Sequence, residues 1–503
     1  MPHRYLRFQA ADGQRLRDGF DRVRAQMAVP AEFPPEVLAA ADAAASEPVL
    51  PNLDRTDIAF VTVDPPGSMD LDQALHIARR PGGGYRVYYA IADVGAFVQP
   101  GSPIDTEANA RAMTLYLPDA RVPLHPTALS EGAASLLPGQ VRPALLWTLD
   151  LDRSGEGVGI DVRRALVRSR AQLSYEQVQR ALDTDTAEEP LTLLREVGKL
   201  RVQREYERGG ISLPLPEQEV VESKGSYNLV FRAPLAVEGW NAQISLLTGM
   251  AAAELMLYGE IGLLRTLPTA PEGAIKRLRR VARALQIEWP PEDSYAEMIR
   301  TLDPRLPRHA AMLNECTSLL RGAGYTAFAG GVPELATHAA VASEYAHVTA
   351  PLRRLADRYT GEVCLALCAG TDVPEWARVA LPALPDRMAK ADQHASQVEA
   401  ACVDLVEAAV LSGRVGEEFS GVVVDVRERG EGGVVQLTEP AVRGRVDGQN
   451  VPLGKRVEVE LTLADIDSRQ VRFALAGKAS PAAPGTAPAV SRPPASGPPA
   501  PSG

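Results

Sequence analysis

The spacing of apolar and polar positions differs from one region of the chain to the next. Near the N-terminus, one apolar face at helical spacing is formed by Leu16, Phe20, Val23 and Met27. Residues 58–64 and 85–94 are β-branched and aromatic runs that predict strands, whereas residues 241–264 follow a long helical pattern. This order predicts a helical segment over residues 1–50 and one large domain of mixed sheet and helices over residues 51–412.

The pattern changes again after residue 415. Residues 419–474 contain short β-branched runs separated by Gly, Asp and Asn turns. Because such turns recur about every ten residues, they predict a five-stranded OB-fold barrel over residues 416–477. Residues 478–503 are rich in Pro, Ala, Ser and Gly and predict a disordered tail. The expected fold class is therefore a multidomain α/β (α+β) protein.

Composition and charge narrow the class of protein. The chain is 45% hydrophobic and 23% charged, which is typical of a globular protein, and its net charge is −11. This charge argues against a broad basic surface that coats nucleic acid. Arginines cluster in residues 161–170, where a local basic channel and a solvated charged face are both open interpretations.

Two further features of the sequence indicate the cellular compartment of the protein. No apolar run approaches the roughly 18 residues of a membrane span, and the N-terminus lacks a secretory signal. The four cysteines have neither CxxC spacing nor downstream histidine ligands, so we expect buried free thiols without zinc or a disulfide partner. They are Cys316, Cys364, Cys368 and Cys402. We expect a cytoplasmic protein that is a monomer.

Three aspartates surround a tight turn in the segment VTVDPPGSMDLDQALHI, residues 61–77. The predicted strand ends at Asp64, and the Pro-Pro-Gly sequence after it forces a turn. Asp70 and Asp72 are two positions apart, so in an extended chain they project to the same face. Two charges about 4 Å apart repel by about 4 kcal/mol at an effective dielectric near 20. The spacing alone leaves two interpretations: a cradle for Mg²⁺ or Mn²⁺, which prefer oxygen ligands, or a solvated acidic turn.

Several segments in a fixed order carry a resemblance to a known family. TVDPPGSMDLDQAL is similar to the signature of the catalytic (RNB) domain of the ribonuclease II family, which is an Asp, a short turn and D-x-D-D-A. Later blocks of the family resemble YYAIADVGAFVQPGSPIDTEANARAMTLYLP, LSYEQV, YERGGISLPLPE and YAHVTAPLRRLADRYT. The likeness spans about residues 54–411, and the barrel after it resembles the S1-like RNA-binding domain of the family.

The resemblance implies a Mg²⁺-dependent 3′→5′ exoribonuclease that degrades single-stranded RNA to nucleoside 5′-monophosphates. Carried over by position, Asp64, Asp70 and Asp72 would hold Mg²⁺ or Mn²⁺, with Asp72 as the most critical acid. Arg353 matches the catalytic arginine, and a guanidinium can stabilise charge that develops on the scissile phosphate.

The resemblance also implies three residues that contact RNA. Tyr116 matches the tyrosine that stacks on the 3′-terminal bases, a contact that tolerates any base. Tyr175 matches a second tyrosine near the active site, for which packing in the core is the alternative. Arg354 is expected to contact the RNA backbone.

The sequence departs from the family pattern at several positions. Gln73 stands where the family has a fourth acid, so it could offer only a carbonyl ligand, and Ala350 replaces the serine beside Arg353. Leu247 and Thr248 replace a pair of glutamates. The alternative function is therefore an RNA-binding scaffold with a decayed nuclease centre, and a third is a phosphodiesterase for DNA or short oligonucleotides. The segment 1–50 is too short for the two small barrels that usually precede this domain, and we expect it to guide RNA.

Overall fold

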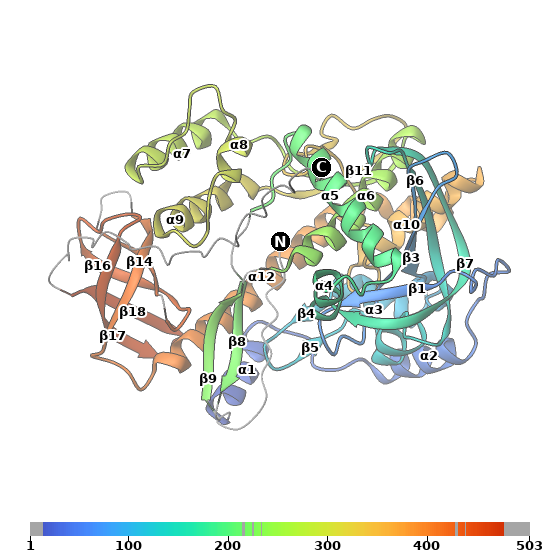
Figure 1. Ribbon diagram of the computed structural model, residues 1–503. Helices are drawn as coiled ribbons and strands as arrows, with labels where there is room; N and C mark the ends of the chain where they lie inside the picture. The colour runs from blue at the N-terminus through green and yellow to red at the C-terminus, as the bar shows by residue number, and fades with distance from the viewer. Residues whose placement is uncertain are drawn as a thin grey trace, which may run out of the picture.

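The computed structural model describes residues 14–213, 217–223, 226–232, 234–427, 431–437 and 439–476. The tail predicted over residues 478–503 lies outside the described residues. Two closed five-stranded barrels stand at opposite sides of the molecule, and the long helix α12 (Leu384–Leu411) runs between them (Figure 1). The fold is therefore a multidomain mixture of helices and sheets, as predicted.

The first barrel holds the predicted acidic segment. Its strands are β1 (Phe60–Asp64), β2 (Gln73–Arg79), β3 (Tyr85–Ala92), β6 (Val141–Leu151) and β7 (Gly157–Ser174). β1 pairs antiparallel with β2 and parallel with β7, which closes the sheet. In β3, Val87 and Tyr89 belong to one buried cluster and Ala90 to another. Because successive side chains point to opposite faces, this strand is buried on both sides.

Helices cover the first barrel and carry part of the site. They are α4 (Tyr175–Asp183), α5 (Glu189–Glu207), α6 (Ala236–Tyr258) and α10 (Leu355–Ala369). The helix predicted over residues 241–264 is wrong at its C-terminal end, where the chain leaves α6 and forms strand β10 (Ile261–Thr266). Glu260 has a φ of 54°, in the left-handed region that a helix cannot continue through. β10 pairs with β11 (Gly324–Ala329) instead.

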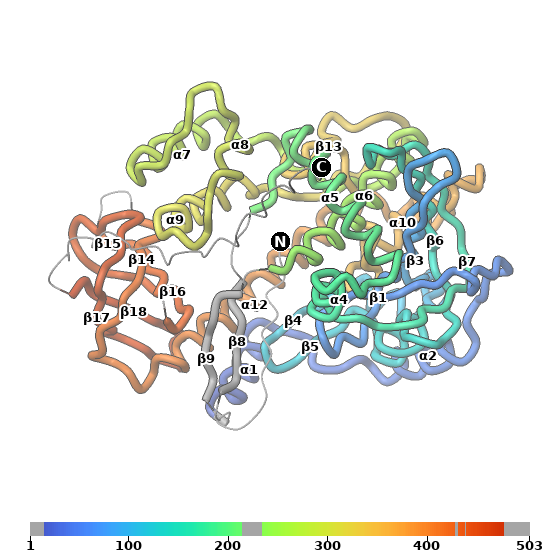
Figure 2. Tube along the Cα trace, in the orientation of Figure 1, coloured from blue at the N-terminus to red at the C-terminus, as the bar shows by residue number. Residues whose placement is uncertain are grey.

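The second barrel confirms the predicted five-stranded OB-type unit. Its strands follow the order β14-β15-β16-β18-β17 and are β14 (Glu418–Val426), β15 (Glu431–Leu437), β16 (Arg443–Gln449), β17 (Arg456–Asp465) and β18 (Gln470–Leu475). α9 (Pro307–Cys316) lies beside β14, and α7 (Glu272–Ala284) and α8 (Tyr295–Arg300) pack with α9 in one buried cluster (Figure 2). Val424 of β14 is buried in the same cluster as Met312 of α9.

The N-terminal segment forms α1 (Gln14–Gln26) and α2 (Pro35–Ser46). Phe20 and Val23 of the predicted apolar face are buried in one cluster with residues of α12. Arg22 of α1 forms an ion pair with Asp467 of the second barrel at 2.8 Å. Arg24 reaches Asp119 beside the first barrel at 2.9 Å. These arginines therefore connect α1 to the second barrel and to the turn that contains Asp119, and an RNA-guiding role for the segment stays a prediction.

The remaining elements are short connections. They are 3-10 helix η1 (Val94–Ala96), α3 (Pro103–Arg111), β4 (Leu115–Tyr116), β5 (Arg121–Val122), π-helix η2 (Leu129–Ala133), β8 (Glu217–Ser223), β9 (Ser226–Arg232), 3-10 helix η3 (Thr317–Leu320), β12 (Thr337–His338), β13 (Ser343–Glu344), α11 (Glu375–Ala380) and 3-10 helix η4 (Leu381–Ala383).

Within the described part of the chain, no helix has the length and apolar character needed to span a membrane. All four cysteines are free thiols, and Cys368 is the one that is partly exposed. The predicted domain boundaries themselves stay predictions.

Candidate active site

The loop between β1 and β2 carries the three predicted aspartates. β1 ends at Asp64, as the sequence predicts, and the chain then turns at Gly67, whose φ of 75° lies in the left-handed region that glycine adopts without strain. β2 begins at Gln73, so the other two acids precede the strand and do not belong to it. Asp70 and Asp72 therefore lie in the loop, where their side chains contact different partners.

Asp72 is buried and is bound to a segment that lies far away in the sequence. Only 4% of the residue is exposed. One carboxylate oxygen accepts a hydrogen bond from the backbone N–H of Leu352 at 2.8 Å, and the other lies 3.3 Å from Nε of Arg353. Burial raises the pKa of Asp72 to about 8, although the charge of Arg353 acts in the opposite direction. The structure thus joins the predicted critical acid to the predicted catalytic arginine.

Asp64 contributes a second buried carboxyl group to the same place. Burial raises its pKa to about 7, the charge of Arg353 lowers it, and the charge of Asp70 raises it further. Its Oδ2 atom is buried and has no hydrogen-bond partner among the described residues. A buried carboxylate oxygen without a donor is costly unless a cation or a proton accompanies it. This atom is the clearest sign that the loop is built for a positively charged ligand.

Asp70 is held by two residues of the hairpin formed by β4 and β5. The hydroxyl of Tyr116 donates to Oδ2 of Asp70 at 3.2 Å, and the guanidinium of Arg121 donates to Oδ1. Arg121 also forms an ion pair with Glu131 at 2.5 Å. Neither Arg121 nor Glu131 is among the residues that the sequence predicts for the site. The available signal was a basic residue shortly after Tyr116, but only the pairing of Tyr116 with Arg121 across the hairpin brings both to Asp70.

The three aspartates share one electrostatic environment without forming a compact cluster of ligands. The charge of Asp70 acts on both Asp64 and Asp72. Among the described residues, however, no three His, Cys, Asp or Glu side chains are grouped closely enough to hold a metal ion. The donor set still suits Mg²⁺, since carboxylate oxygens are its preferred protein ligands and one of them lacks a donor. The predicted metal role of the three acids therefore stays a prediction.

Gln73, the substitute for the fourth acid, is engaged in a polar network. Its Nε2 donates to the carbonyl of Thr349 at 2.7 Å. Its Oε1 accepts from the hydroxyl of Tyr89 at 2.5 Å and lies 3.4 Å from the hydroxyl of Ser245. A carboxylate could not make the first of these bonds, because it has no hydrogen to donate. Gln73 is thus fitted to its surroundings as an amide, and its predicted role as a carbonyl ligand stays a prediction.

Asp357 fixes the segment that carries Arg353. It lies in the first turn of α10 and accepts from the backbone N–H of Ala350 at 2.7 Å. It also accepts two hydrogen bonds from the guanidinium of Arg354, at 2.9 and 2.7 Å. The structure therefore gives the Arg354 side chain an internal partner, and its expected contact with the RNA backbone stays a prediction. Ala350 is fully buried, so the missing serine hydroxyl would lie inside the protein.

The two predicted tyrosines contact different residues. Tyr116 is half-buried and contacts Asp70, as described above. Tyr175 begins α4, is half-buried, and its hydroxyl accepts from Nδ2 of Asn241 at 3.4 Å. Tyr175 and Asp64 both influence the pKa of the buried Tyr89 hydroxyl, which is raised first of all by burial. The contacts of both tyrosines with RNA stay predictions.

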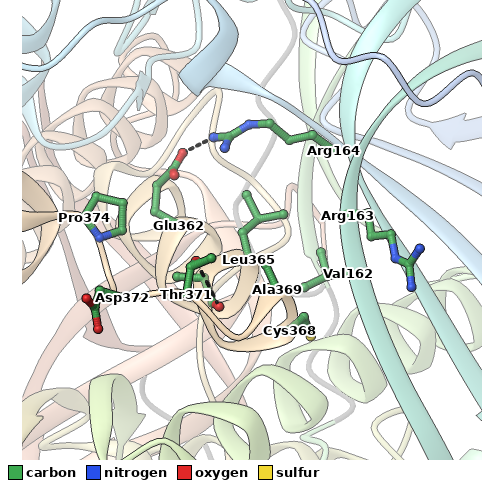
Figure 3. A pocket seen from close by; sticks show the side chains of 11 residues that line it. Val162, Arg163, Arg164, Glu362, Leu365, Cys368, Ala369, Thr371, Asp372 and Pro374 are labelled. Atoms are coloured by element: carbon green, nitrogen blue, oxygen red, sulfur yellow. Dashed lines mark hydrogen bonds and ion pairs between the residues drawn. The ribbon is translucent and has the colours of Figure 1, made fainter.

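The arginine-rich segment 161–170 lies on the outside of the first barrel. Arg163 pairs with Asp161 at 3.0 Å, and Arg164 pairs with Asp93 at 2.8 Å and with Glu362. Figure 3 shows Arg164 pointing toward Glu362 at the edge of a cavity of about 460 Å³ between β7 and α10. None of the predicted site residues lines this cavity. These ion pairs do not support a basic channel at this segment.

Comparisons with known proteins place these observations in a family. A model of the RNB domain matches residues 53–366, and a model of the RNase II-type exonuclease C-terminal S1 domain matches residues 417–476. Ribonuclease R of Aquifex aeolicus is 26% identical over 463 residues, which cover 84% of this chain and 64% of that protein. The chain therefore spans less than two thirds of the length of this relative.

Two solved structures share the fold. Mycoplasma genitalium RNase R in complex with ribose-methylated single-stranded RNA superimposes with a TM-score of 0.81 at 21% identity, covering 93% of this chain and 79% of that one. Yeast Ssd1, a pseudonuclease, gives a TM-score of 0.65 at 19% identity over 82% of this chain and 53% of that one. The RNB match covers more than half of the chain and includes every predicted site residue. The chain belongs to the RNB-domain family and carries an RNase II-type C-terminal S1 domain.

Proposed function

We propose that this chain is a Mg²⁺-dependent 3′→5′ exoribonuclease that hydrolyses single-stranded RNA to nucleoside 5′-monophosphates. The observation that carries the proposal is the ion pair between the buried Asp72 and the partly buried Arg353, which joins both ends of the RNB domain beside the half-buried Asp64. An acid and an arginine held together in this way favour chemistry on a phosphate, because both groups are in place before the substrate binds.

The residues of the loop suit the metal that this chemistry requires. Asp64, Asp70 and Asp72 would hold Mg²⁺, or Mn²⁺, with Gln73 offering a carbonyl oxygen. When bound, the ion supplies a nucleophilic water near neutral pH and neutralises charge on the scissile phosphate. Arg353 would pair with a non-bridging phosphate oxygen through its planar guanidinium and stabilise the charge that grows there during cleavage.

The tyrosines and the second barrel would hold the RNA. The rings of Tyr116 and Tyr175 would position the terminal nucleotides by stacking without selecting a base. Arg354 is proposed to act near the RNA backbone. The S1 domain would hold the upstream part of the strand, mainly through charge, since its aromatic rings Phe419 and Phe473 are both buried. We propose that the protein acts as a monomer in the cytoplasm.

One observation favours a second candidate, an RNA-binding scaffold with a decayed nuclease centre. Gln73 is neutral and makes hydrogen bonds through both its amide nitrogen and its oxygen, and the acids are not grouped as a ready metal site within the described residues. A scaffold needs only the RNA-binding surface, so the two candidates differ in whether RNA is shortened.

The test is to incubate 5′-end-labelled single-stranded RNA with the protein in Mg²⁺, and in parallel with EDTA. We expect stepwise shortening and release of mononucleotides that stop in EDTA. Asp72→Asn should abolish cleavage while RNA is still retained on a filter, and a single-stranded DNA of the same sequence should persist. RNA that is retained but unchanged would refute the nuclease in favour of the scaffold, and cleavage of DNA at the same rate would favour a general phosphodiesterase.

A further inference from the structure

Arg121 lies between two acids, Asp70 of the acidic loop and Glu131. Its guanidinium donates to Oδ1 of Asp70 through Nη1 and to Glu131 through Nη2. The side chains are partly shielded from water, with exposed fractions of 25% for Arg121, 14% for Asp70 and 26% for Glu131. An arginine is always charged, so in this structure it serves as a resident cation at one acid of the proposed metal centre.

The contacts of Asp70 show what would change when a divalent cation binds. Each carboxylate oxygen is engaged, Oδ1 by Arg121 and Oδ2 by the Tyr116 hydroxyl at 3.2 Å. A divalent cation needs a carboxylate oxygen at short range and is repelled by a guanidinium on that oxygen. If Arg121 leaves Oδ1, the Tyr116 bond still holds the carboxylate in orientation.

Glu131 is an alternative ion-pair partner for Arg121. It lies in the π-helix η2 and already binds the second nitrogen of the guanidinium. The arginine can therefore shift from Asp70 toward Glu131 without becoming an unpaired charge, which would be costly at a partly buried position. Without Glu131, Arg121 would become an unpaired charge when it left Asp70.

We propose that Arg121 is a positioning residue that competes with the divalent cation for Asp70, and that Glu131 receives Arg121 when the cation binds. The proposal rests on the proposed function, since it takes the acidic loop to be the metal site. In this arrangement Arg121 sets the metal affinity of the centre, and Glu131 acts only through Arg121.

The test is isothermal titration of Mn²⁺ into the full chain without RNA. Arg121→Gln removes the competitor and should tighten Mn²⁺ binding by about two- to fivefold, the range expected for a partly exposed charge pair. Glu131→Gln should weaken binding several-fold. Arg24→Gln is the matched control, because it removes one positive charge and an ion pair to Asp119 near the same hairpin but does not contact Asp70. Its affinity should equal that of the wild type.

A double substitution separates the competition from a simple field effect. If Glu131 acts through Arg121, Glu131→Gln should have little effect once Arg121→Gln is present. If both residues act only by their charges, the two effects should add. Additive effects, or an affinity of Arg121→Gln equal to or weaker than that of the wild type, would overturn the proposal.

The same titration distinguishes this failure from failure of the proposed function. Wild-type protein should bind Mn²⁺ at a site that Asp64→Asn removes. If the wild type binds no such ion, the metal centre is refuted and the competition falls with it. If the ion binds and only the Arg121 variants behave otherwise, the metal centre stands and the competition alone is refuted. A circular-dichroism spectrum of each variant confirms that it is folded.

Discussion

Gln73→Glu tests whether the neutral residue at the fourth acidic position is required by its surroundings. Nε2 of Gln73 donates to the carbonyl of Thr349 at 2.7 Å, and Oε1 accepts from the hydroxyl of Tyr89 at 2.5 Å. Glutamate has the same shape but offers two acceptors. It would keep the bond from Tyr89 and turn a second oxygen toward the Thr349 carbonyl. The substitution should therefore destabilise the folded protein.

The expected fall in the free energy of unfolding of Gln73→Glu has two causes. Thr349 is 4% exposed, and leaving a buried carbonyl without a donor costs about 1–3 kcal/mol. Burying the new negative charge of the glutamate beside Asp72 adds to this cost. Together these losses predict that the free energy of unfolding falls by at least about 1–3 kcal/mol.

Urea unfolding followed by circular dichroism, with EDTA present, measures this change. Gln177→Glu is the matched control, because Oε1 of Gln177 only accepts a hydrogen bond, from the Ser174 N–H at 2.8 Å in the first turn of α4. A carboxylate serves there equally well, so this control should stay within about 0.5 kcal/mol of the wild type. If Gln73→Glu loses less than about 1 kcal/mol, Gln73 is not required as an amide and the reasoning is refuted.

Two further substitutions test the segment that carries the arginine. Arg353→Ala should lower the rate of RNA cleavage about 10²–10³-fold with little change in RNA retention on a filter, because it removes a stabiliser of transition-state charge. A rate within a few-fold of the wild type would contradict this role. Asp357→Asn should lower the midpoint of urea unfolding, since it leaves the buried charge of Arg354 without its carboxylate, at a cost of about 3–5 kcal/mol. An unchanged midpoint would show that Arg354 finds another partner.

The parts of the fold that the sequence predicts are those fixed by local patterns. The β-branched runs that end at Asp64 and fill residues 419–474 are strands, since buried strands repeat apolar residues over short ranges. The end of α6 escaped prediction for a physical reason. Residues 261–264 are as apolar as the helix before them, and only the left-handed backbone at Glu260 and the pairing with β11 turn them into a strand.

The residues of the site likewise divide into those that local sequence patterns indicate and those that they do not. The pairing of Asp72 with Arg353 connects residues 281 positions apart, and no pattern near either residue indicates it; the family resemblance alone brought them together. Arg121 was missed because its role depends on a two-residue strand pair, too short to leave a periodic signal. The expected convergence of three acids assumed that the chain is extended through Asp70 and Asp72, whereas the structure keeps both in a loop.

The bond between Asp72 and the Leu352 N–H makes the acid and the arginine one structural unit. If Asp72 lost its acceptor oxygen, the backbone next to Arg353 would lose its anchor, so Asp72→Ala would disturb both groups at once. Asparagine keeps a carbonyl oxygen that can accept from Leu352, and it replaces only the oxygen that faces Arg353. A loss of cleavage in Asp72→Asn therefore reports on that second carboxyl oxygen, because the arginine segment retains its anchor. Comparing Asp72→Ala with Asp72→Asn, in RNA cleavage and in stability, separates two roles of Asp72. One is to hold the segment that carries Arg353, and the other is to act in the chemistry itself.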